Sequence, residues 1–322
     1  MKRRHLLIAA AAGAALPLLA RAQTYPSKAI NWVVGFPPGG GADGVTRLVA
    51  AKVSQNIGQP IVVENRPGAS SIIAAQYVAQ APADGYTLFS CEQGSLVFNT
   101  ALYSKLPYDP ARDFAPVTDM IRAPLLLVVN AGFPANDLHS FVDYARKQPG
   151  KLNFGSPGRG LAHHLAMEAF KARAKLDIVD IQYKGIAPVV QDVVAGQIPM
   201  GAIDTVVVLP HLKSGKLRAL ASFSTKRLGV TPEVPSMAEL GYDGLDIAPI
   251  VGVAVPRATP REVVAKLNTE VVRALRDPEV SAKLTGLGLE IIGDTPEQFA
   301  AFLQAEGSRW LPLIRSLNIK LD

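Results

Sequence analysis

Two glycine-rich segments contain the residues whose types and spacing are best suited to binding a ligand. The first segment reads Phe36-Pro37-Pro38-Gly39-Gly40-Gly41-Ala42-Asp43, and the second reads Ser156-Pro157-Gly158-Arg159-Gly160. Each lies between an expected strand and a helical pattern. Glycine allows a ligand to approach the backbone closely, and the unpaired amides at the N-terminus of a helix attract negative charge. We therefore expect each segment to bind an anionic group.

The first segment leaves two alternatives open. From Gly39 to Gly44 it has the Gly-x-Gly-x-x-Gly spacing of a dinucleotide-binding loop, and Glu64 follows 20 residues later. Pro37-Pro38 would stiffen a turn that must be tight in that motif, which argues against a dinucleotide. In the other alternative the segment is a turn capped by Asp43 that binds nothing.

The second segment adds polar side chains to its backbone amides. Ser156 supplies a hydroxyl and Arg159 a guanidinium; in the alternative, Ser156 only caps the helix and Arg159 is solvated. Ser156, His164 and Asp204 are also the residue types of a hydrolytic triad, but the Gly-x-Ser-x-Gly turn of such enzymes is missing. Asp204 is expected either to cap the following helix or to receive an amine of the ligand.

No metal site and no cofactor are expected. His163 and His164 are adjacent, so on a helix their side chains point about 100° apart and do not chelate one ion. His164 and Glu168 are four residues apart, but two ligands do not make a zinc site. Cys91 is the only cysteine, and we expect it to be a small buried apolar side chain.

The composition is that of an ordinary globular protein. Of the 322 residues, 48% are apolar and 19% are charged, which is typical of neither a disordered chain nor a disulfide-built miniature domain. A chain of this length can bury one or two hydrophobic cores, and the length predicts either two domains or one large one.

The first 22 residues are expected to be a secretory signal. A basic start, Met1-Lys2-Arg3-Arg4-His5, precedes an apolar run over residues 6–20, and Ala20-Arg21-Ala22 is a small-x-small cleavage site. The paired arginines leave both general and twin-arginine export open. Cleavage after Ala22 lowers the net charge from +6 to +2, which removes the argument for a nucleic-acid partner. We therefore expect an exported, periplasmic protein.

Short apolar runs alternate with helical patterns along the rest of the chain, which predicts an α/β fold with mostly parallel sheets. The expected strands are 30–34, 61–63, 86–89, 125–129, 152–154, 178–182, 217–221, 251–255 and 289–292. Two irregular stretches, 114–124 and 242–249, look like crossings between domains. We therefore expect a first lobe of residues 23–123 plus 247–322 and a second lobe of residues 124–246.

Several longer motifs resemble those of the receptors of tripartite tricarboxylate transporters, called the Bug family. They are Tyr25-Pro26-Ser27-Lys28, the first glycine-rich segment, the stretch from Gly58 to Ala69 that includes Val62-Val63-Glu64-Asn65-Arg66-Pro67-Gly68, Ala83-Asp84-Gly85-Tyr86-Thr87-Leu88, Leu106-Pro107-Tyr108-Asp109-Pro110, Tyr183-Lys184-Gly185 and Gly215-Lys216-Leu217-Arg218-Ala219-Leu220-Ala221. The resemblance implies a two-lobed, type II-like periplasmic binding protein fold with its ligand cleft between the lobes. It also implies that both glycine-rich segments hold one carboxylate of a small ligand.

The resemblance assigns substrate-binding positions residue by residue. They are Phe36, Pro38, Gly39, Gly40, Gly41, Ala42, Asp43, Ser156, Gly158, Gly160, Leu161, His164 and Asp204. Arg159 fills a variable position of the second motif, and we include it because a cation there suits an anionic ligand. Leu161 stands where the family usually has a threonine, so one hydroxyl is missing from the expected cleft. Asp204 is preceded by isoleucine rather than by the usual phenylalanine.

Three functions follow as hypotheses. The leading one is a monomeric transport receptor that binds a small mono- or dicarboxylate and delivers it to membrane permease subunits. An exported sensor without a permease is the second, and an exported hydrolase or dehydrogenase-like enzyme is the third. The missing nucleophile turn argues against the hydrolase and export argues against the dehydrogenase, so we expect no catalysis.

Overall fold

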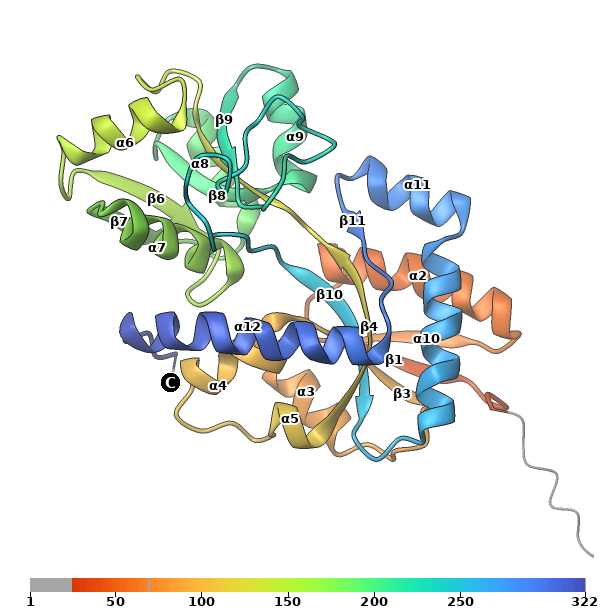
Figure 1. Cartoon of the computed structure of the whole chain (residues 1–322). Coiled ribbons are helices and arrows are strands. Elements are labelled where there is room, and N and C mark those ends of the chain that lie inside the picture. Colours follow the sequence, from red (N-terminus) through yellow and green to blue (C-terminus); the bar gives the residue numbers. More distant parts are fainter. Residues whose placement is uncertain (1–24, 69, 322) are drawn as a thin grey trace, which may run out of the picture.

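The chain folds into two α/β lobes, each built on its own β-sheet (Figure 1). This computed structural model describes residues 25–68 and 70–321. The expected signal segment, 1–22, lies outside the described residues.

The first lobe contains a six-stranded sheet in the order β11-β4-β10-β3-β1-β2. Its strands are β1 (Ile30–Val34), β2 (Ile61–Asn65), β3 (Thr87–Cys91), β4 (Phe114–Arg122), β10 (Ile250–Pro256) and β11 (Glu290–Ile291). β1 runs parallel to both β2 and β3, and β10 runs antiparallel to β3 and β4. Trp32, Val33 and Val34 are fully buried because helices cover both faces of this sheet.

The second lobe contains a five-stranded sheet in the order β7-β6-β8-β5-β9. Its strands are β5 (Leu125–Asn130), β6 (Leu152–Ser156), β7 (Ile178–Gln182), β8 (Met200–Asp204) and β9 (Leu217–Ser222). β6 is parallel to β7 and β8, whereas β5 is antiparallel to β8 and β9.

These pairings confirm two α/β lobes and refine the expectation of mostly parallel sheets. Most strands of each sheet do run in one direction, but both sheets are mixed. The reason is that β10 and β5 are the strands that enter a lobe from the other one. Each of them inserts between two strands that run the opposite way.

Helices cover both faces of the first sheet. One face carries α2 (Gly41–Ile57), α10 (Arg261–Leu275) and α11 (Pro278–Gly286), whose apolar residues share a core with Trp32 and Val253. The other face carries α3 (Ile72–Ala79), the π-helix η1 (Gly94–Phe98), α4 (Asn99–Leu102), the short α5 (Pro110–Asp113) and α12 (Pro296–Ser316).

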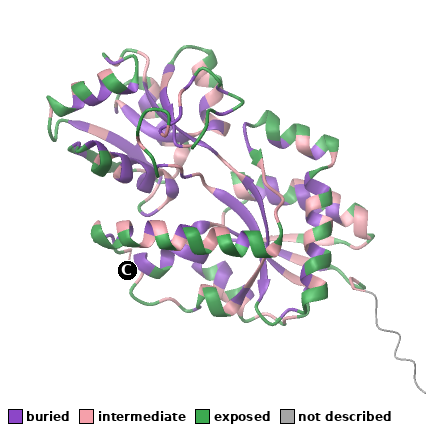
Figure 2. Cartoon of the chain, viewed as in Figure 1, coloured by how far each residue is buried: buried purple, intermediate pink, exposed green. Residues whose placement is uncertain are grey.

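The second sheet is covered in the same way. α6 (Leu138–Arg146) and α7 (Ala162–Ala174) pack on one face, and α8 (Ile186–Ala195) and α9 (Thr205–Lys213) pack on the other. α6 begins with a capping box in which Asp137 and Ser140 satisfy each other's backbone amides. Figure 2 shows the purple, buried residues concentrated in the strands of both lobes.

The two crossings between the lobes lie side by side. The amide of Ala123, which follows β4, donates to the carbonyl of Pro249, which precedes β10, at 2.8 Å. Residues 114–122, expected to be part of an irregular crossing, form instead the strand β4. That expectation is wrong because Pro116 is tolerated at a register shift in the pairing of β4 with β10.

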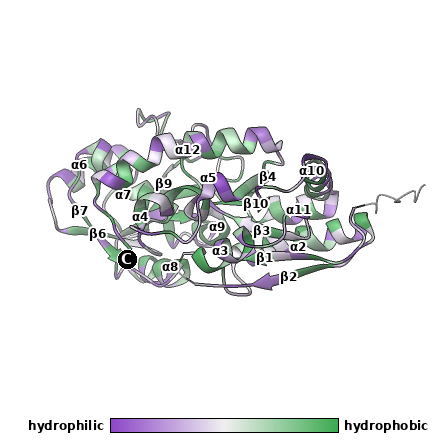
Figure 3. Cartoon of the chain, turned by 90° about the horizontal axis from the view of Figure 1, so that it is seen from below, coloured by the Kyte–Doolittle hydropathy of each residue, from purple (hydrophilic) through white to green (hydrophobic). Residues whose placement is uncertain are grey.

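The lobes also share one hydrophobic cluster. It includes Phe89 of the first lobe, Phe170 of the second and Trp310 on α12, and all three are buried. Figure 3 shows hydrophilic and hydrophobic residues mixed along α12, as expected for a helix with one buried side. Within residues 25–68 and 70–321, no helix combines the length and the apolar character needed to cross a membrane.

Candidate ligand-binding site

Each sheet has a point where two neighbouring parallel strands send their connections to opposite faces. In the first lobe β1 leads to α2 on one face, while its neighbour β3 leads to η1 on the other. In the second lobe β6 leads to α7 and its neighbour β8 leads to α9 on the opposite face. Ligands of α/β sheets bind in the crevice that opens at such a point, at the carboxyl ends of the strands. The two glycine-rich segments therefore lie at the two positions where sheet topology creates a crevice.

The helices that follow these segments have N-termini without side-chain caps. Gly40 is the N-cap of α2 and Leu161 is the N-cap of α7, and neither makes a side-chain capping bond. Among the described residues, no side chain accepts a hydrogen bond from the first-turn amides, 41–43 and 162–164. Those amides carry the positive end of the helix dipole and remain available to an anion.

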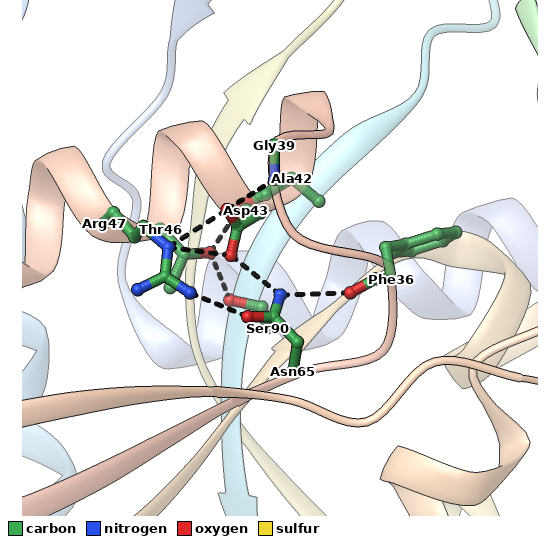
Figure 4. Close-up of polar contacts among 8 residues, drawn as sticks. All are labelled: Phe36, Gly39, Ala42, Asp43, Thr46, Arg47, Asn65 and Ser90. Carbon is green, nitrogen blue, oxygen red and sulfur yellow. Dashed lines mark hydrogen bonds and ion pairs between the residues drawn. The ribbon is translucent and has the colours of Figure 1, made fainter.

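Asp43 holds the first glycine-rich segment in shape (Figure 4). Its carboxylate is buried and accepts hydrogen bonds from the Gly39 amide at 2.9 Å, from Arg47 Nε at 3.0 Å and from Asn65 Nδ2 at 2.7 Å. Asn65 Nδ2 also donates to the Phe36 carbonyl at 3.0 Å. Burial alone would raise the pKa of Asp43, but these hydrogen bonds outweigh it and hold that pKa below its usual value. Asp43 is therefore ionised and fully engaged with the protein.

A second polar link joins α2 to the neighbouring strand. Thr46 Oγ1 donates to the Ala42 carbonyl at 2.7 Å and lies 2.6 Å from Ser90 Oγ on β3. Both hydroxyls are buried. This link fixes the first turn of α2 against the end of β3, where the crevice of the first lobe begins.

Asp180 on β7 has the corresponding role in the second lobe. Ser156 Oγ donates to Asp180 Oδ1 at 2.8 Å and accepts from Gln182 Nε2 at 2.8 Å. Burial opposes the ionisation of Asp180, but hydrogen bonds from His164, Ser156 and Gln182 hold its pKa below the usual value. The only proton of the Ser156 hydroxyl is used in the hydrogen bond to Asp180, so this hydroxyl can accept a hydrogen bond from a ligand but cannot donate one.

His164 connects this network to the glycine-rich segment itself. Its Nδ1 accepts from the Gly160 amide at 3.3 Å, and its Nε2 lies 3.3 Å from Asp180 Oδ2. An Nδ1 that accepts requires the proton to sit on Nε2, which then donates to the carboxylate. Asp180 lies between Ser156 and His164, whereas a hydrolytic triad places the imidazole between the serine and the acid.

Asp204 neither caps α9 nor stands free. It occupies the N-cap position but makes no side-chain capping bond, and its Oδ2 lies 3.3 Å from His163 Nε2 on α7. The pair joins the end of β8 to the first turn of α7, beside the crevice of the second lobe. Nδ1 of His163 has no hydrogen-bond partner in the described part of the chain and is buried.

The remaining predicted positions fall into two groups. Pro38, Gly39, Gly40, Gly41 and Arg159 are exposed, and Arg159 makes no ion pair with any described residue. The other group is more enclosed and consists of Phe36, Ala42, Gly158, Gly160 and Leu161. The structure thus gathers the predicted residues at two loops, one in each lobe.

Sequence reasoning missed several residues that shape these loops. Arg47 and Asn65 fix Asp43, and Asp180 fixes Ser156 and His164. These partners lie on other elements, so no local pattern marks them. The one available signal was the position of Asn65, two residues after the expected strand 61–63.

The start of η1 is a further part of the crevice that no motif marked. Glu92 to Ser95 follow β3 directly, at the switch point of the first lobe. Ser95 Oγ lies 3.2 Å from the Glu92 amide, which donates to it. A π-helical turn at such a place is a common feature of functional sites.

No group of three or more His, Cys, Asp and Glu side chains among the described residues is placed to hold a metal ion. Two surface hollows, of about 710 and 420 Å³, lie elsewhere. The first is lined by residues of α2 and α10, including Lys52 and Arg273, and the second by residues of η1 and α12. We place the site by strand topology rather than by these hollows.

Comparison with known proteins identifies the relatives of this chain. The model of the tripartite tricarboxylate transporter family receptor matches residues 45–319. Protein BugT of Bordetella pertussis is 35% identical over 97% of this chain and 95% of its own length.

Two solved structures are similar along their whole length. Rpa4515 of R. palustris, solved with adipate, is 36% identical over 92% of this chain and 100% of its own, with a TM-score of 0.82. MatC of Rhodopseudomonas palustris, solved with malate, is 34% identical over 90% of this chain and 100% of its own, with a TM-score of 0.78. Together with the matching family model, these similarities show that this chain belongs to the tripartite tricarboxylate transporter receptors, the Bug family of periplasmic solute-binding proteins.

Proposed function

We propose that this chain is a periplasmic receptor that binds a small mono- or dicarboxylate between its lobes and delivers it to the membrane subunits of a tripartite tricarboxylate transporter. The observation that carries the proposal is the pair of uncapped helix N-termini, α2 and α7, at the two switch points. The lobes would be residues 23–123 with 247–322 and residues 124–246. The sheet membership of the strands supports that division.

The charges around the loops favour an acid as the ligand. The carboxylates of Asp43 and Asp180, which hold the two loops, are engaged by hydrogen bonds from the protein itself rather than left free for a ligand. First-turn amides at both helices would contribute about 0.3–1 kcal/mol each where exposed and up to ~2 kcal/mol where partly buried. Relatives solved with adipate and malate support a dicarboxylate in particular.

A receptor must release its cargo unchanged, and the polar network of the second loop agrees with that role. The imidazole of His164 is engaged with Asp180 and Gly160, so it does not reach Ser156 as a general base would. We therefore propose that the protein does not catalyse a reaction on its ligand. Conversion of a bound acid that disappears in Ser156→Ala would contradict this.

A thermal-shift screen of the mature chain tests the proposal. Adipate, malate and hexanoate are compared with adipamide, which has the length of adipate but no charge. A ligand present at 100 times its Kd should add about 2.7 kcal/mol to the free energy of unfolding. We expect stabilisation by one or more of the acids and none by the diamide. Stabilisation by sugars or amines alone would overturn the proposal.

Arg159 is proposed to bind the second carboxylate of a dicarboxylate. A guanidinium pairs with a carboxylate through two parallel hydrogen bonds. Arg159→Ala should therefore weaken a dicarboxylate by about tenfold or more, or about 1.4 kcal/mol, while leaving the matching monocarboxylate unchanged. Arg257→Ala is the control, because Arg257 is also exposed but follows β10 at the opposite edge of the sheet. Unchanged affinity for both acids would show that Arg159 is a solvated surface residue, and equal losses for both would show that it does not bind the second carboxylate.

A further inference from the structure

We propose that Glu92 contacts the ligand in its protonated form and donates a hydrogen bond to the bound carboxylate. This inference rests on the proposed function and adds a residue that selects acids over amines. Glu92 is the first residue after β3, at the switch point of the first lobe.

The position of Glu92 follows from the register of the sheet. β1 and β3 are parallel, and Val34 lies opposite Ser90. The chain then leaves β1 at Gly35 and β3 at Glu92, so both residues emerge at the same edge. Ser71 connects them: its Oγ donates to Glu92 Oε1 at 3.3 Å, and a Cβ added to Gly35 would lie 1.6 Å from the same Oγ. One hydroxyl therefore separates the Glu92 carboxyl from the base of the first glycine-rich segment.

The carboxyl of Glu92 has no cationic partner. In the described part of the chain, no Lys, Arg or His forms an ion pair or hydrogen bond with it, and the Ser71 hydroxyl is the one polar contact of its Oε1. Its Oε2 has no polar partner among the same residues, and Glu92 is only partly buried. A carboxyl placed in this way has one oxygen free to interact with a ligand.

The surroundings favour the acid form. Partial burial raises the pKa of Glu92 to about 8, against the opposing hydrogen bond from Ser71. The titratable groups that interact with it are Cys91 on β3 and Tyr108, which precedes α5, and burial raises the pKa of both. All three groups are therefore mostly uncharged near neutral pH.

A protonated carboxyl next to a set of free amides suits one kind of ligand. An ionised Glu92 would repel the carboxylate that the α2 amides attract. A protonated Glu92 donates a hydrogen bond to the same carboxylate and so adds to the binding by those amides. The same proton makes the site a poor partner for an ammonium group. The affinity for an acid should therefore fall as pH rises through the pKa of Glu92.

The test is isothermal titration of adipate and malate into the wild type, Glu92→Gln and Glu92→Ala at pH 6, 7 and 9. We expect the wild-type Kd to rise about tenfold or more between pH 6 and pH 9. Glu92→Gln keeps a neutral donor, so it should bind at pH 6 within about threefold of the wild type and show a flat pH profile. Glu92→Ala should bind about tenfold more weakly at pH 6. Glu262→Gln, an exposed residue of α10, is the control and should follow the wild type.

Each other outcome has a distinct meaning. A pH dependence that persists unchanged in Glu92→Gln would overturn the role of Glu92 while leaving the proposed function intact. Tight binding of aspartate or glutamate that increases with pH and is lost in Glu92→Gln would assign Glu92 to an ammonium instead, and would also overturn the inference. If no acid binds the wild type or Glu92→Gln at pH 6, the proposed function itself fails.

Discussion

Gly160 in the second lobe packs directly on Leu102 in the first. A Cβ added to Gly160 would lie 2.5 Å from Leu102 Cδ1 and 2.8 Å from its Cδ2, so the backbone and the leucine side chain are in full contact. Gly160 belongs to the glycine-rich segment before α7, and Leu102 ends α4, which follows the switch-point residues of the other lobe. The contact therefore fixes how closely the two halves of the candidate site approach each other.

Gly160→Ala should separate the lobes and weaken ligand binding. The φ of Gly160 is 75°, which already disfavours alanine, and the added methyl group meets Leu102. We expect a loss of about 2–3 kcal/mol of stability and a larger radius of gyration by small-angle scattering. Gly215→Ala is the control, because its φ is 68° but nothing lies within 4 Å of the added Cβ. Adding Leu102→Ala to Gly160→Ala should bring the radius of gyration back toward the wild-type value, and a failure to do so would contradict the role of this contact.

Asp43→Asn should loosen the first glycine-rich segment. It removes the buried charge that Arg47 and Asn65 satisfy, so we expect a loss of about 2–3 kcal/mol at pH 7 by urea denaturation. Because the pKa of Asp43 is lowered in the folded state, its contribution is present above its usual pKa and is lost as pH falls through the folded value. The difference between the variant and the wild type should therefore shrink below about pH 4.

The surface pair Glu279–Lys283 provides the matched control for Asp43. Like Asp43 and Arg47, these two residues form an ion pair four positions apart on a helix, but both of their side chains are exposed. Glu279→Gln should leave stability almost unchanged, because solvent screens an exposed ion pair. An equally small effect of Asp43→Asn would show that Asp43 does not hold the segment.

Glu92 should also make the stability of the protein without ligand depend on pH. Its pKa is raised in the folded state, so between its ordinary value of 4.5 and about 8 the folded protein binds more protons than the unfolded chain. Stability contributed by this site therefore falls as pH rises through that range. Glu92→Gln should be more stable than the wild type by roughly 1–3 kcal/mol at pH 9, with a gap that narrows toward pH 5. A gap that is constant with pH would mean that Glu92 is ionised throughout.

Gln93 is expected to control the crossing between the lobes. Its Nε2 donates to the Ala248 carbonyl at 2.7 Å, and its Oε1 accepts from the Ile250 amide at 3.2 Å, so one buried side chain holds the crossing strand to the crevice. Gln93→Ala should lower the free energy of unfolding by about 1–3 kcal/mol. It should also broaden the distribution of distances between the two lobes in small-angle scattering. Asn268→Ala is the control, because Asn268 also bridges two backbone carbonyls, but both lie within the first lobe. The same broadening in both variants would contradict a specific role for Gln93.

Local patterns in the sequence predict much of the fold. Short apolar runs mark nine of the eleven strands in the described residues, and the glycines mark the loops before α2 and α7. β8 and β4 were not identified as strands. The first is a short apolar run that contains Gly201, and the second contains Pro116 at a register shift. Both depend on neighbouring strands for their conformation, which a local pattern does not reveal.

The site was less predictable than the fold, for a physical reason. Residues such as Glu92 and Asp180 acquire their roles from the order of strands and from partners on other elements. Asp180 meets Ser156 because β6 and β7 are parallel neighbours, and Glu92 meets Ser71 because the segments that follow β2 and β3 emerge at the same edge of the sheet. Strand order is a property of the whole sheet, so it appears only in the structure.

A crystal structure of the mature chain with the tightest-binding acid of the screen tests the central claim most directly. We expect a carboxylate of the ligand within hydrogen-bonding distance of first-turn amides of both α2 and α7, directly or through one water, with the lobes closed around it. A carboxylate bound instead in the hollow beside Lys52 and Arg273, with nothing between the two glycine-rich segments, would contradict the account.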